Sequence, residues 1–529
     1  MATNLSFSDT GFFSKIAVDY REAREEMRPF YLHDVSLDGV NAAIENRKQF
    51  AQNRQILHDE LRLQYQGIEL TEKENLHIDL LKSNTTFTIT TAHQPNIFTG
   101  PLYMMYKILH VIQLSIYLKK EFPQYDFVPV YYMGSEDADL DEIGQFTVDG
   151  KKYVWETKQT GAVGRMIVDN DLRKILEQLK RQIDVNPFGK ELTEMFDRCY
   201  SLGKTIQQAT LEIMHFLFGE MGLITLIPDN AALKKTFEPV IKKELLERFS
   251  HKIVTKTADA LHKAGYKQQA SGRDLNLFYL FEDHRERIEF AEGKYFVQSL
   301  NLEFSEAEIL NELESYPERF SGNVILRGAF QETVLPNIIF VGGGGEIAYW
   351  LELKNVFASV NVPYPILLLR NSFALLNKIQ TKRFASLELQ PHWLFKPTFQ
   401  ILDELSIRKS GKHELNAEMD ALKAIYLNIG QKAVASSSSL QKHVMALYTQ
   451  AINKIQRLEK KIQKAERNKL IAEKERLEKL KEILFPHDSL QERVENVSSF
   501  YSVYGPTLLP QILEASPALN SQFVMLDLQ

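Results

Sequence analysis

Five short apolar segments constrain the fold of this chain more than any other feature of its sequence. Each runs into a polar or glycine-rich stretch, and several are followed by apolar side chains at helical spacing. Strands that are apolar throughout and alternate with helices are typical of parallel sheets covered by helices. We therefore predict an α/β fold with a Rossmann-like parallel-sheet core, whose strands lie in residues 88–91, 128–133, 222–229, 337–346 and 363–372.

The first of these strands opens a strand–turn–helix unit, TITTAHQPNIFTGPLYMMYKIL. The apolar spacing after the turn predicts a helix that begins at Pro101, where the missing N–H costs nothing. Ligands commonly bind at such a turn, because backbone N–H groups and the positive end of the helix converge there. We expect His93, Gln94 and Asn96 to bind an anionic group here, with Gly100 permitting close approach. His93 could add a charge if protonated, which would make binding pH-dependent. A polar turn that only connects the strand to the helix fits the same residues.

Two further polar clusters follow other predicted strands. The second strand runs into Glu136, Asp137 and Asp139, which could orient an amine, bind a sugar hydroxyl or hold Mg²⁺, or could simply cap the next helix. The fourth strand runs into glycines 342–345 and Glu346; glycines let backbone approach a phosphate, although the spacing matches neither the dinucleotide motif nor the P-loop, and a tight turn is the alternative. Because the carboxyl ends of parallel strands meet at one edge of a sheet, the three clusters predict a single site there.

The chain is longer than a single hydrophobic core usually supports, and its pattern changes along the sequence. We predict that the Rossmann-like core occupies residues 1–375, with insertions at about 150–220 and 272–335, the second of them of α+β type. Residues 376–485 lack strand patterns and predict an α-helical coiled-coil domain, and residues 486–529 return to the core.

A long charged helix is predicted over residues 439–484, from a serine-rich cap to just before a proline. From Asn453 to Leu484 it carries 11 Lys or Arg and 6 Asp or Glu, a net charge of +5. Mixed signs are more typical of a solvated helix face than of a nucleic-acid surface. We expect a homodimer through this coiled coil, with folding back onto ELNAEMDALKAIYLNIG as the intrachain alternative. The heptad spacing breaks in one eight-residue step among Ile455, Ile462, Leu470, Leu477 and Leu484.

Bulk properties argue against several classes of function. A net charge of −6 gives no overall attraction to nucleic acid or to an anionic membrane. The start of the sequence lacks a signal-peptide pattern, and no run of about 18 apolar residues could span a bilayer, so we expect a cytoplasmic protein without membrane contact. The single cysteine, Cys199, predicts a buried thiol and fits a reducing compartment. Neither HExxH, GxSxG nor a His/Cys ligand set occurs, which argues against zinc hydrolases and serine esterases and predicts no metal site.

Six blocks stand in order between about residues 85 and 505. They are TAHQPNIFTGPLYMMYKI, VPVYYMGSEDADLDEI, LFYLFEDHRERI, NVILRGAFQETVLPNIIFVGGGGEIAYWLEL, PILLLRNS and FPHDSLQERVENVSSFYSVYG. Together they resemble the cysteine ligases of bacillithiol biosynthesis, the BshC family. Agreement of six blocks in order and spacing is far more specific than any single motif above.

The resemblance implies a Rossmann-like core and a coiled coil that can mediate dimers. It also implies a reaction, the last step of bacillithiol synthesis, which joins the carboxyl of L-cysteine to the glucosamine amine of glucosaminyl-malate. An amide requires an activated carboxyl, and the fold resembles that of enzymes that form aminoacyl-adenylates, so ATP with Mg²⁺ is the cofactor to consider. This chain lacks their HIGH and KMSKS signatures: its first loop reads HQPN, and KIQTK at 378–382 is only a faint echo.

Residue roles follow from the resemblance and the three clusters together. Glu136, Asp137 and Asp139 would be catalytic, one of them holding the substrate ammonium and accepting its proton. Gly343 and Gly344 would contact a nucleotide. The expected substrate-binding residues are His93, Gln94, Asn96, Gly100, Tyr103, Arg327, Glu332, Glu346, Tyr349, Asn371 and Ser372.

The chain departs from the family pattern at two places. Ala92-His93-Gln94 stands where many members have Gly-Gln-Gln, and Ala138 stands where many have histidine. His93, on the facing loop, could therefore supply the imidazole that is missing at position 138. Two other functions fit the same features: a non-catalytic nucleotide-binding scaffold, and a nucleotidyltransferase with another acceptor. The sequence leaves open how cysteine is activated, whether AMP or ADP is released, and which acid is the base.

Overall fold

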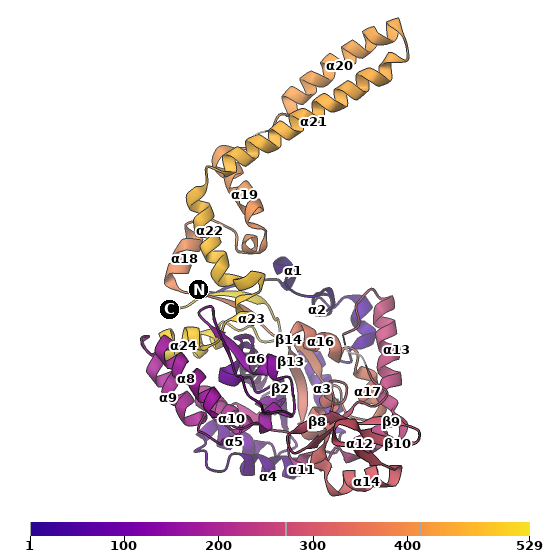
Figure 1. Ribbon diagram of the computed structural model, residues 1–529, viewed down its shortest axis with the longest axis vertical. Helices are drawn as coiled ribbons and strands as arrows, with labels where there is room; N and C mark the ends of the chain where they lie inside the picture. Colours follow the sequence, from indigo (N-terminus) through magenta and orange to yellow (C-terminus); the bar gives the residue numbers. More distant parts are fainter. Residues whose placement is uncertain (1, 270–271, 413) are drawn as a thin grey trace. The chain divides into compact units, whose positions relative to one another are not determined.

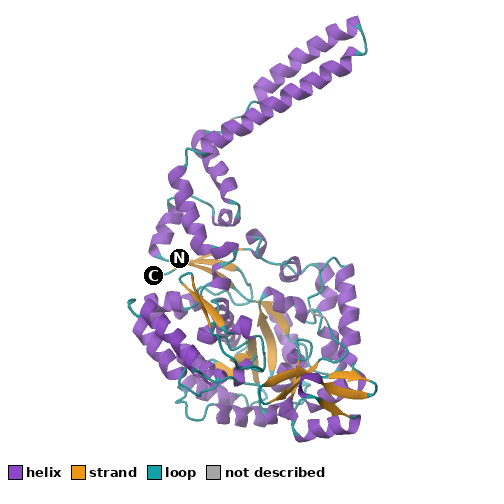
Figure 2. Cartoon of the chain, in the orientation of Figure 1, coloured by secondary structure: helices purple, strands orange, loops and turns teal. Residues whose placement is uncertain are grey.

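The chain forms two compact units in the computed structural model, which describes residues 2–269, 272–412 and 414–529 (Figure 1). Unit 1 runs to Leu375 and resumes over Asp488–Leu528, and unit 2 comprises Leu376–His487 with Gln529. Strands gather in unit 1, whereas unit 2 is built of helices (Figure 2). Among the described residues, no helix combines the length and the apolar character needed to cross a membrane.

A five-stranded parallel sheet lies at the centre of unit 1 and confirms the predicted Rossmann-like core. The strand order is β14-β13-β2-β3-β6, so β13, β2 and β3 are direct neighbours. Their carboxyl ends therefore bring the three polar clusters of the sequence to one edge of the sheet. The strands are β2 (Thr86–His93), β3 (Asp126–Met133), β6 (Ile224–Leu226), β13 (Asn337–Gly342) and β14 (Ile366–Leu369).

Helix α6 (Tyr103–Glu121) connects β2 to β3 and packs against both. The prediction that this helix begins at Pro101 is wrong, because it begins two residues later. Pro101 forms an isolated antiparallel β-bridge with Asn496, and the N–H of Leu102 donates to the carbonyl of Glu495 at 2.8 Å. The C-terminal segment thus holds the chain out of the helix at these two residues.

Two antiparallel three-stranded sheets occupy the segment 272–335. One has the order β12-β7-β8, in which β7 (Leu277–Phe281) and β8 (His284–Arg287) form a hairpin. The remaining strands here are β9 (Glu289–Ala291), β10 (Lys294–Val297), β11 (Leu302–Phe304) and β12 (Phe320–Gly322). Elsewhere in unit 1 lie β1 (Ala2–Leu5), β4 (Gln145–Val148), β5 (Lys151–Val154), β15 (Ser372–Leu376) and β16 (Phe523–Asp527).

Helices surround these sheets. Three of them, α8 to α10, fill most of the segment 150–220. The helices of unit 1 besides α6 are α1 (Phe7–Thr10), α2 (Lys15–Arg21), α3 (Leu37–Lys48), α4 (Arg54–Gln64), α5 (Glu72–Leu80), α7 (Leu140–Ile143), α8 (Asn170–Ile183), α9 (Gly189–Cys199), α10 (Ile206–Phe218), α11 (Ala231–Lys235), α12 (Glu238–Glu247), α13 (Phe249–Lys263), α14 (Glu306–Ser315), α15 (Arg327–Val334), α16 (Gly344–Trp350), α17 (Lys354–Ser359), α23 (Gln491–Val494), α24 (Ser498–Tyr504) and α25 (Leu508–Glu514).

Unit 2 contains α18 (Lys378–Ala385), α19 (Thr398–Ser410), α20 (Asn416–Ser436), α21 (Leu440–Arg467) and α22 (Ile471–Leu484). The single helix predicted over 439–484 is wrong: it is interrupted between α21 and α22, where the eight-residue step from Ile462 to Leu470 interrupts the heptads.

Helices α20 and α21 form a hairpin within the chain, which is the intrachain alternative of the sequence analysis (Figure 1). Tyr426 packs on Tyr448, with ring centroids 5.7 Å apart, and Gly430 lies beside Val444. The apolar side of α22, with Leu477 and Leu484, is buried, and α22 packs against α18 and α19. The heptad positions therefore have partners in their own chain.

Candidate functional site

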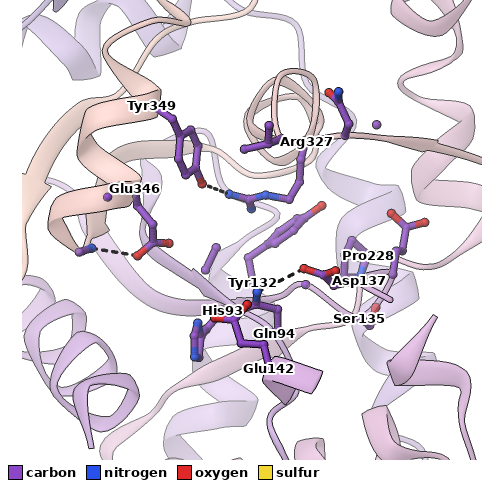
Figure 3. A pocket seen from close by; sticks show the side chains of 18 of the residues that line it. His93, Gln94, Tyr132, Ser135, Asp137, Glu142, Pro228, Arg327, Glu346 and Tyr349 are labelled. Atoms are coloured by element: carbon purple, nitrogen blue, oxygen red, sulfur yellow. Dashed lines mark hydrogen bonds between the residues drawn. The ribbon is translucent and has the colours of Figure 1, made fainter. Parts of the chain in front are cut away.

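A cavity of about 800 Å³ opens at the carboxyl ends of β2, β3 and β13 (Figure 3). A cavity of this size is typical of small-molecule and cofactor sites. Its lining comes from the sheet edge and the helices that follow it, from the segment 272–335, and from Arg493 of the C-terminal segment. The predicted site residues that line it are His93, Gln94, Tyr103, Glu136, Asp137, Arg327, Gly343, Gly344, Glu346 and Tyr349.

The loop after β2 contributes His93 and Gln94. The Gln94 side chain donates to Oδ2 of Asp137 at 3.2 Å, which joins the first cluster to the second (Figure 3). The ring of His93 packs edge-on to that of Tyr103, and its buried Nε2 has no hydrogen-bond partner. Burial, together with the charges of Lys107 and Arg370, lowers the pKa of His93 well below its ordinary value. A neutral imidazole is therefore favoured at neutral pH.

The next turn of this loop is strained. Phe98, Thr99 and Gly100 all have positive φ angles, of 49°, 73° and 61°, which is costly for a β-branched residue such as Thr99. The buried side chain of Asn496 stabilises the turn by donating to the carbonyls of Phe98 and Gly100, at 2.7 and 2.6 Å. Tyr200 adds a further bond, accepting from the N–H of Phe98 at 2.7 Å.

Two predicted site residues, Asn96 and Gly100, lie at this strained turn instead of in the cavity wall. Asn96 is buried and does not line the cavity, nor does Gly100. A Cβ at Gly100 would lie 2.6 Å from the Cβ of Asn96, so the two residues pack directly on each other. Glycine is needed at position 100 for this contact as well as for its positive φ.

The acidic cluster divides into three environments. Glu136 forms an ion pair with Lys234 and accepts from Ser321 Oγ at 3.0 Å. Asp137 lines the cavity and, within the described residues, accepts two long bonds, from Gln94 and from the N–H of Asp139 at 3.3 Å. Asp139 is exposed, does not line the cavity and caps α7 by accepting from the N–H of Glu142 at 3.1 Å.

A buried charge network lies behind Glu136. Lys234 also contacts Asp229 at 3.1 Å, and Arg165 holds the same carboxylate through two bonds of 2.6 and 2.7 Å. Burial alone would raise the pKa of Asp229, but Lys234 and Arg165 outweigh it and hold that pKa below its ordinary value. Glu136 is thus fixed in position by a charged scaffold, whereas Asp137 is not.

The glycine turn after β13 is closed by its own helix. The N–H of Gly343 donates to Glu346 Oε2 at 2.8 Å, a capping arrangement at the start of α16 (Figure 3). The other partner of Glu346 is Lys107 of α6, whose ammonium also donates to the carbonyl of Ala92 at 2.9 Å. Burial lowers the pKa of Lys107.

Three predicted residues lie in the interior instead of the cavity wall. Glu332 pairs with Arg47 and accepts from Asn337 at 2.7 Å. Asn371 donates to Ser516 Oγ and to the carbonyl of Pro517, both at 2.7 Å. Ser372 donates to Glu492 at 3.1 Å. We call Glu332, Asn371 and Ser372, with these partners, the buried polar cluster; all three predicted residues are fully enclosed and absent from the cavity lining.

The sequence analysis missed several cations that line the cavity. Arg327 was predicted, and it donates to the hydroxyl of Tyr349 at 2.8 Å. The signal for two of the missed residues was the alternation of arginines in HRER, which places them on one face of a strand. The missed lining cations are Lys107, Arg273, Arg285, Arg287, Arg370 and Arg493.

The acids of the cavity do not form a metal centre. Within the described ranges, no group of three or more His, Cys, Asp or Glu side chains is placed to hold a metal ion. The single cysteine is also remote from this chemistry, because Cys199 is buried with its sulfur 3.6 Å from that of Met195, and burial raises the pKa of its thiol to about 12.

Comparisons with known proteins agree along the whole chain. The family model described as "Bacillithiol biosynthesis BshC, N-terminal Rossmann-like domain" matches residues 1–371, and the corresponding "C-terminal coiled-coil domain" matches residues 373–528. A protein of Flavobacterium johnsoniae is 37% identical over 522 residues, which is 98% of each chain. One of Christiangramia forsetii is 36% identical over 99% of each chain, and one of Prosthecochloris aestuarii is 28% identical over 94% of each chain. All three relatives are named "Putative cysteine ligase BshC".

Proposed function

We propose, from the premise that this chain belongs to the BshC family of bacillithiol biosynthesis, that it is a cytoplasmic ligase that joins L-cysteine to glucosaminyl-malate. The bond formed would be an amide between the cysteine carboxyl and the glucosamine amine, as the last step of bacillithiol synthesis. The observation that carries this proposal is a large cavity at the carboxyl edge of a parallel sheet, in which the lightly bonded carboxylate of Asp137 shares the lining with several arginines.

Asp137 is the residue that we assign to the amine. A glucosamine amine is largely protonated at neutral pH, so a neighbouring carboxylate would hold the ammonium and accept its proton as the amine attacks. Both Asp137 oxygens keep an unused lone pair, because each accepts a single long bond. Glu136 is less suited to this role, since Lys234 and Ser321 already bond it.

His93 would act beside Asp137 as a neutral group. Its imidazole lines the cavity and does not carry a charge at neutral pH, so it can form a hydrogen bond without repelling an ammonium. Gln94 would orient the Asp137 carboxylate through the bond that joins them.

The cysteine carboxyl must also be activated before the amide can form. The cavity is large enough for a nucleotide, and several of its cations have no acidic partner among the residues that the structure describes, which favours ATP as the activator. The predicted contact through Gly343 and Gly344 fits less well, because the N–H of Gly343 is already bonded to Glu346. No Mg²⁺ ligand set is present among the described residues. We therefore assign no residue of this chain to the activation step.

The proposal is tested by product formation. Purified protein is incubated with cysteine and glucosaminyl-malate, in matched reactions with and without ATP and Mg²⁺, and the thiol product is sought by mass spectrometry. Product that requires both substrates supports the ligase. Tight binding of the substrates without turnover under either condition would instead indicate the non-catalytic scaffold.

We also propose that the chain forms a homodimer through the α20/α21 hairpin. Outside the contact between α20 and α21, the hairpin exposes further apolar side chains. Ile425, one turn before Ile429 on α20, is 56% exposed. Exposed apolar side chains at helical spacing are typical of a surface that another protein covers. The other exposed apolar residues of the hairpin are Leu427, Val434, Leu440, Met445, Leu447 and Leu458.

Light scattering at micromolar concentration tests the dimer. Ile425→Lys with Ile429→Lys should convert it to a monomer, because two charges would be buried in the interface. Ala424→Lys is the control, because this exposed position on the same helix is neither three nor four residues from Ile425 or Ile429, and it should leave the mass unchanged. A wild-type chain that is monomeric with α20 and α21 folded would contradict the proposal.

A further inference from the structure

The β7–β8 hairpin presents two arginines to the cavity. Its register pairs Phe278 with Arg287 and Leu280 with Arg285, so these side chains share one face of the hairpin, while Tyr279 and Glu286 share the other. Phe278, Arg285 and Arg287 all line the cavity. The guanidinium of Arg285 lies over the ring of Phe278, 3.9 Å from its centroid, which restricts where the side chain can point.

These arginines differ from the cations of the sheet edge in what they contact. Lys107 is paired with Glu346, and Arg370 is paired with Glu492. In contrast, Arg285 and Arg287 make no ion pair with any residue in the described part of the chain, and the same holds for Arg273, which precedes the hairpin. The Nε of Arg285 is moreover buried without a hydrogen-bond partner.

Arg285 itself is half-buried, and its enclosed Nε–H is costly to leave unbonded unless a ligand supplies an acceptor. Burial lowers the pKa of Arg285, and only the charges of Glu136 and Asp137 offset that effect. Of these two acids, Asp137 is the one that we assign to the ammonium. The cavity thus has acids on one side and arginines on another, where Arg287 and Arg273 are exposed and Arg285 keeps an unbonded Nε–H.

We infer that Arg285 and Arg287, supported by Arg273, form a subsite for the two carboxylates of the malyl group of the amino-sugar substrate. This inference rests on the proposed function and specifies its substrate orientation. A guanidinium matches a carboxylate in charge and planar geometry, and two carboxylates require more than one such group. The substrate would span the cavity, with its ammonium at Asp137 and its carboxylates at the hairpin.

The variants Arg285→Gln and Arg287→Gln test the subsite by calorimetry with four probes: glucosaminyl-malate, methyl glucosaminide, malate and ATP. Each variant should weaken glucosaminyl-malate and malate by about 10- to 100-fold, since a charge-assisted bond is lost. Methyl glucosaminide has no carboxylate, and its affinity should not change. Arg285→Lys should retain part of the affinity, because the charge remains and the fork of donors does not.

Lys294→Gln is the matched control, because it removes one positive charge from an exposed pair in the same segment, outside the cavity. It should leave all four affinities unchanged. Unchanged affinity for glucosaminyl-malate in both arginine variants would overturn the subsite, as would weakened ATP binding with glucosaminyl-malate unaffected, which would assign the arginines to phosphate.

The binding readout separates this inference from the proposed function. If the wild-type protein forms product and the arginine variants bind glucosaminyl-malate as it does, only the subsite fails. If the wild-type protein forms no product but loses malate affinity on substitution of Arg285, the ligase fails and the carboxylate subsite stands.

Discussion

Carboxylates in the cavity wall and in the buried polar cluster have different numbers of partners. Asp137 in the cavity wall accepts two long hydrogen bonds and lines the open cavity. Glu332 in the buried polar cluster accepts from Gln331 and Asn337 with one oxygen and pairs with Arg47 through the other. Asp137 follows β3 at the carboxyl edge of the sheet, whereas Glu332 precedes β13 and belongs to the opposite, amino edge. A site residue is distinguished by acceptors that the protein has left unfilled.

The largest expected effect concerns the buried polar cluster. Glu332→Gln should lower the free energy of unfolding by about 3–5 kcal/mol, because it leaves the guanidinium of Arg47 buried without its counter-charge. Urea denaturation measures this loss. In folded protein the KM for both substrates should stay unchanged.

Glu303→Gln is the control for this change, since its partner Lys294 and Glu303 itself are both about half exposed. It should have no measurable effect on stability. A large rise in KM for Glu332→Gln, without loss of stability, would place Glu332 in the site and break the comparison.

The second prediction separates the acids of the wall. Asp137→Asn should lower turnover by about 10² or more if Asp137 accepts the proton of the amine, because asparagine keeps the shape and removes the base. Asp139→Asn should have little effect, since asparagine caps a helix as well as aspartate does. Turnover assays on both variants, with circular dichroism as the check on folding, decide this. Equal losses in the two variants would contradict the division that the structure makes.

The third prediction compares histidines. His110 lies in the interior, where Nδ1 accepts from the N–H of Asn371 at 3.2 Å and Nε2 donates to the carbonyl of Ala518 at 2.6 Å. Burial lowers its pKa to about 4, so between pH 6.5 and pH 4 the unfolded chain binds a proton that the folded chain does not. The stability contributed by neutral His110 is complete above pH 6.5 and is lost as the pH falls.

Unfolding at pH 7 and pH 5 measures this contribution. His110 should account for a loss of about 2 kcal/mol between the two, which His110→Gln should not show, because glutamine does not titrate. The exposed His262→Gln is the control and should keep the full loss. A pH dependence that is the same in His110→Gln as in the wild type would contradict the assignment.

The sheet and its edge were predictable from sequence because their signals are local. Apolar strands flanked by helices specify a parallel sheet, and the three polar clusters meet since β13, β2 and β3 are neighbours. The interior role of Asn371 and Ser372 was not predictable, because their partners Ser516 and Glu492 lie more than a hundred residues away. A polar residue after a strand looks the same in sequence whether a ligand or a distant segment satisfies it.

The same limit explains the helix errors. Pro101 reads as a helix start by every local rule, and only its bridge to Asn496 delays the helix. In unit 2, the heptads of residues 439–484 indicated an apolar stripe but not its partners, which proved to be α18 and α19 for α22 and α20 for α21. Local periodicity determines which face is buried, and the tertiary structure determines what covers it.

The smallest expected effect comes from the first loop, where two amides two residues apart fall on opposite sides of the comparison. Gln94→Ala removes the donor that orients Asp137, and a lost bond of this kind costs about 0.5–1.5 kcal/mol, so the KM for glucosaminyl-malate should rise several-fold with the cysteine KM unchanged. Asn96→Ala removes a buried side chain packed on Gly100 and should lower the thermal midpoint without changing either KM. Steady-state kinetics and thermal unfolding of the two variants check both statements. If Asn96→Ala also raises the KM for glucosaminyl-malate at unchanged stability, Asn96 contributes to the substrate site. The strained turn that follows it, which Asn496 stabilises, would then belong to the cavity wall as well.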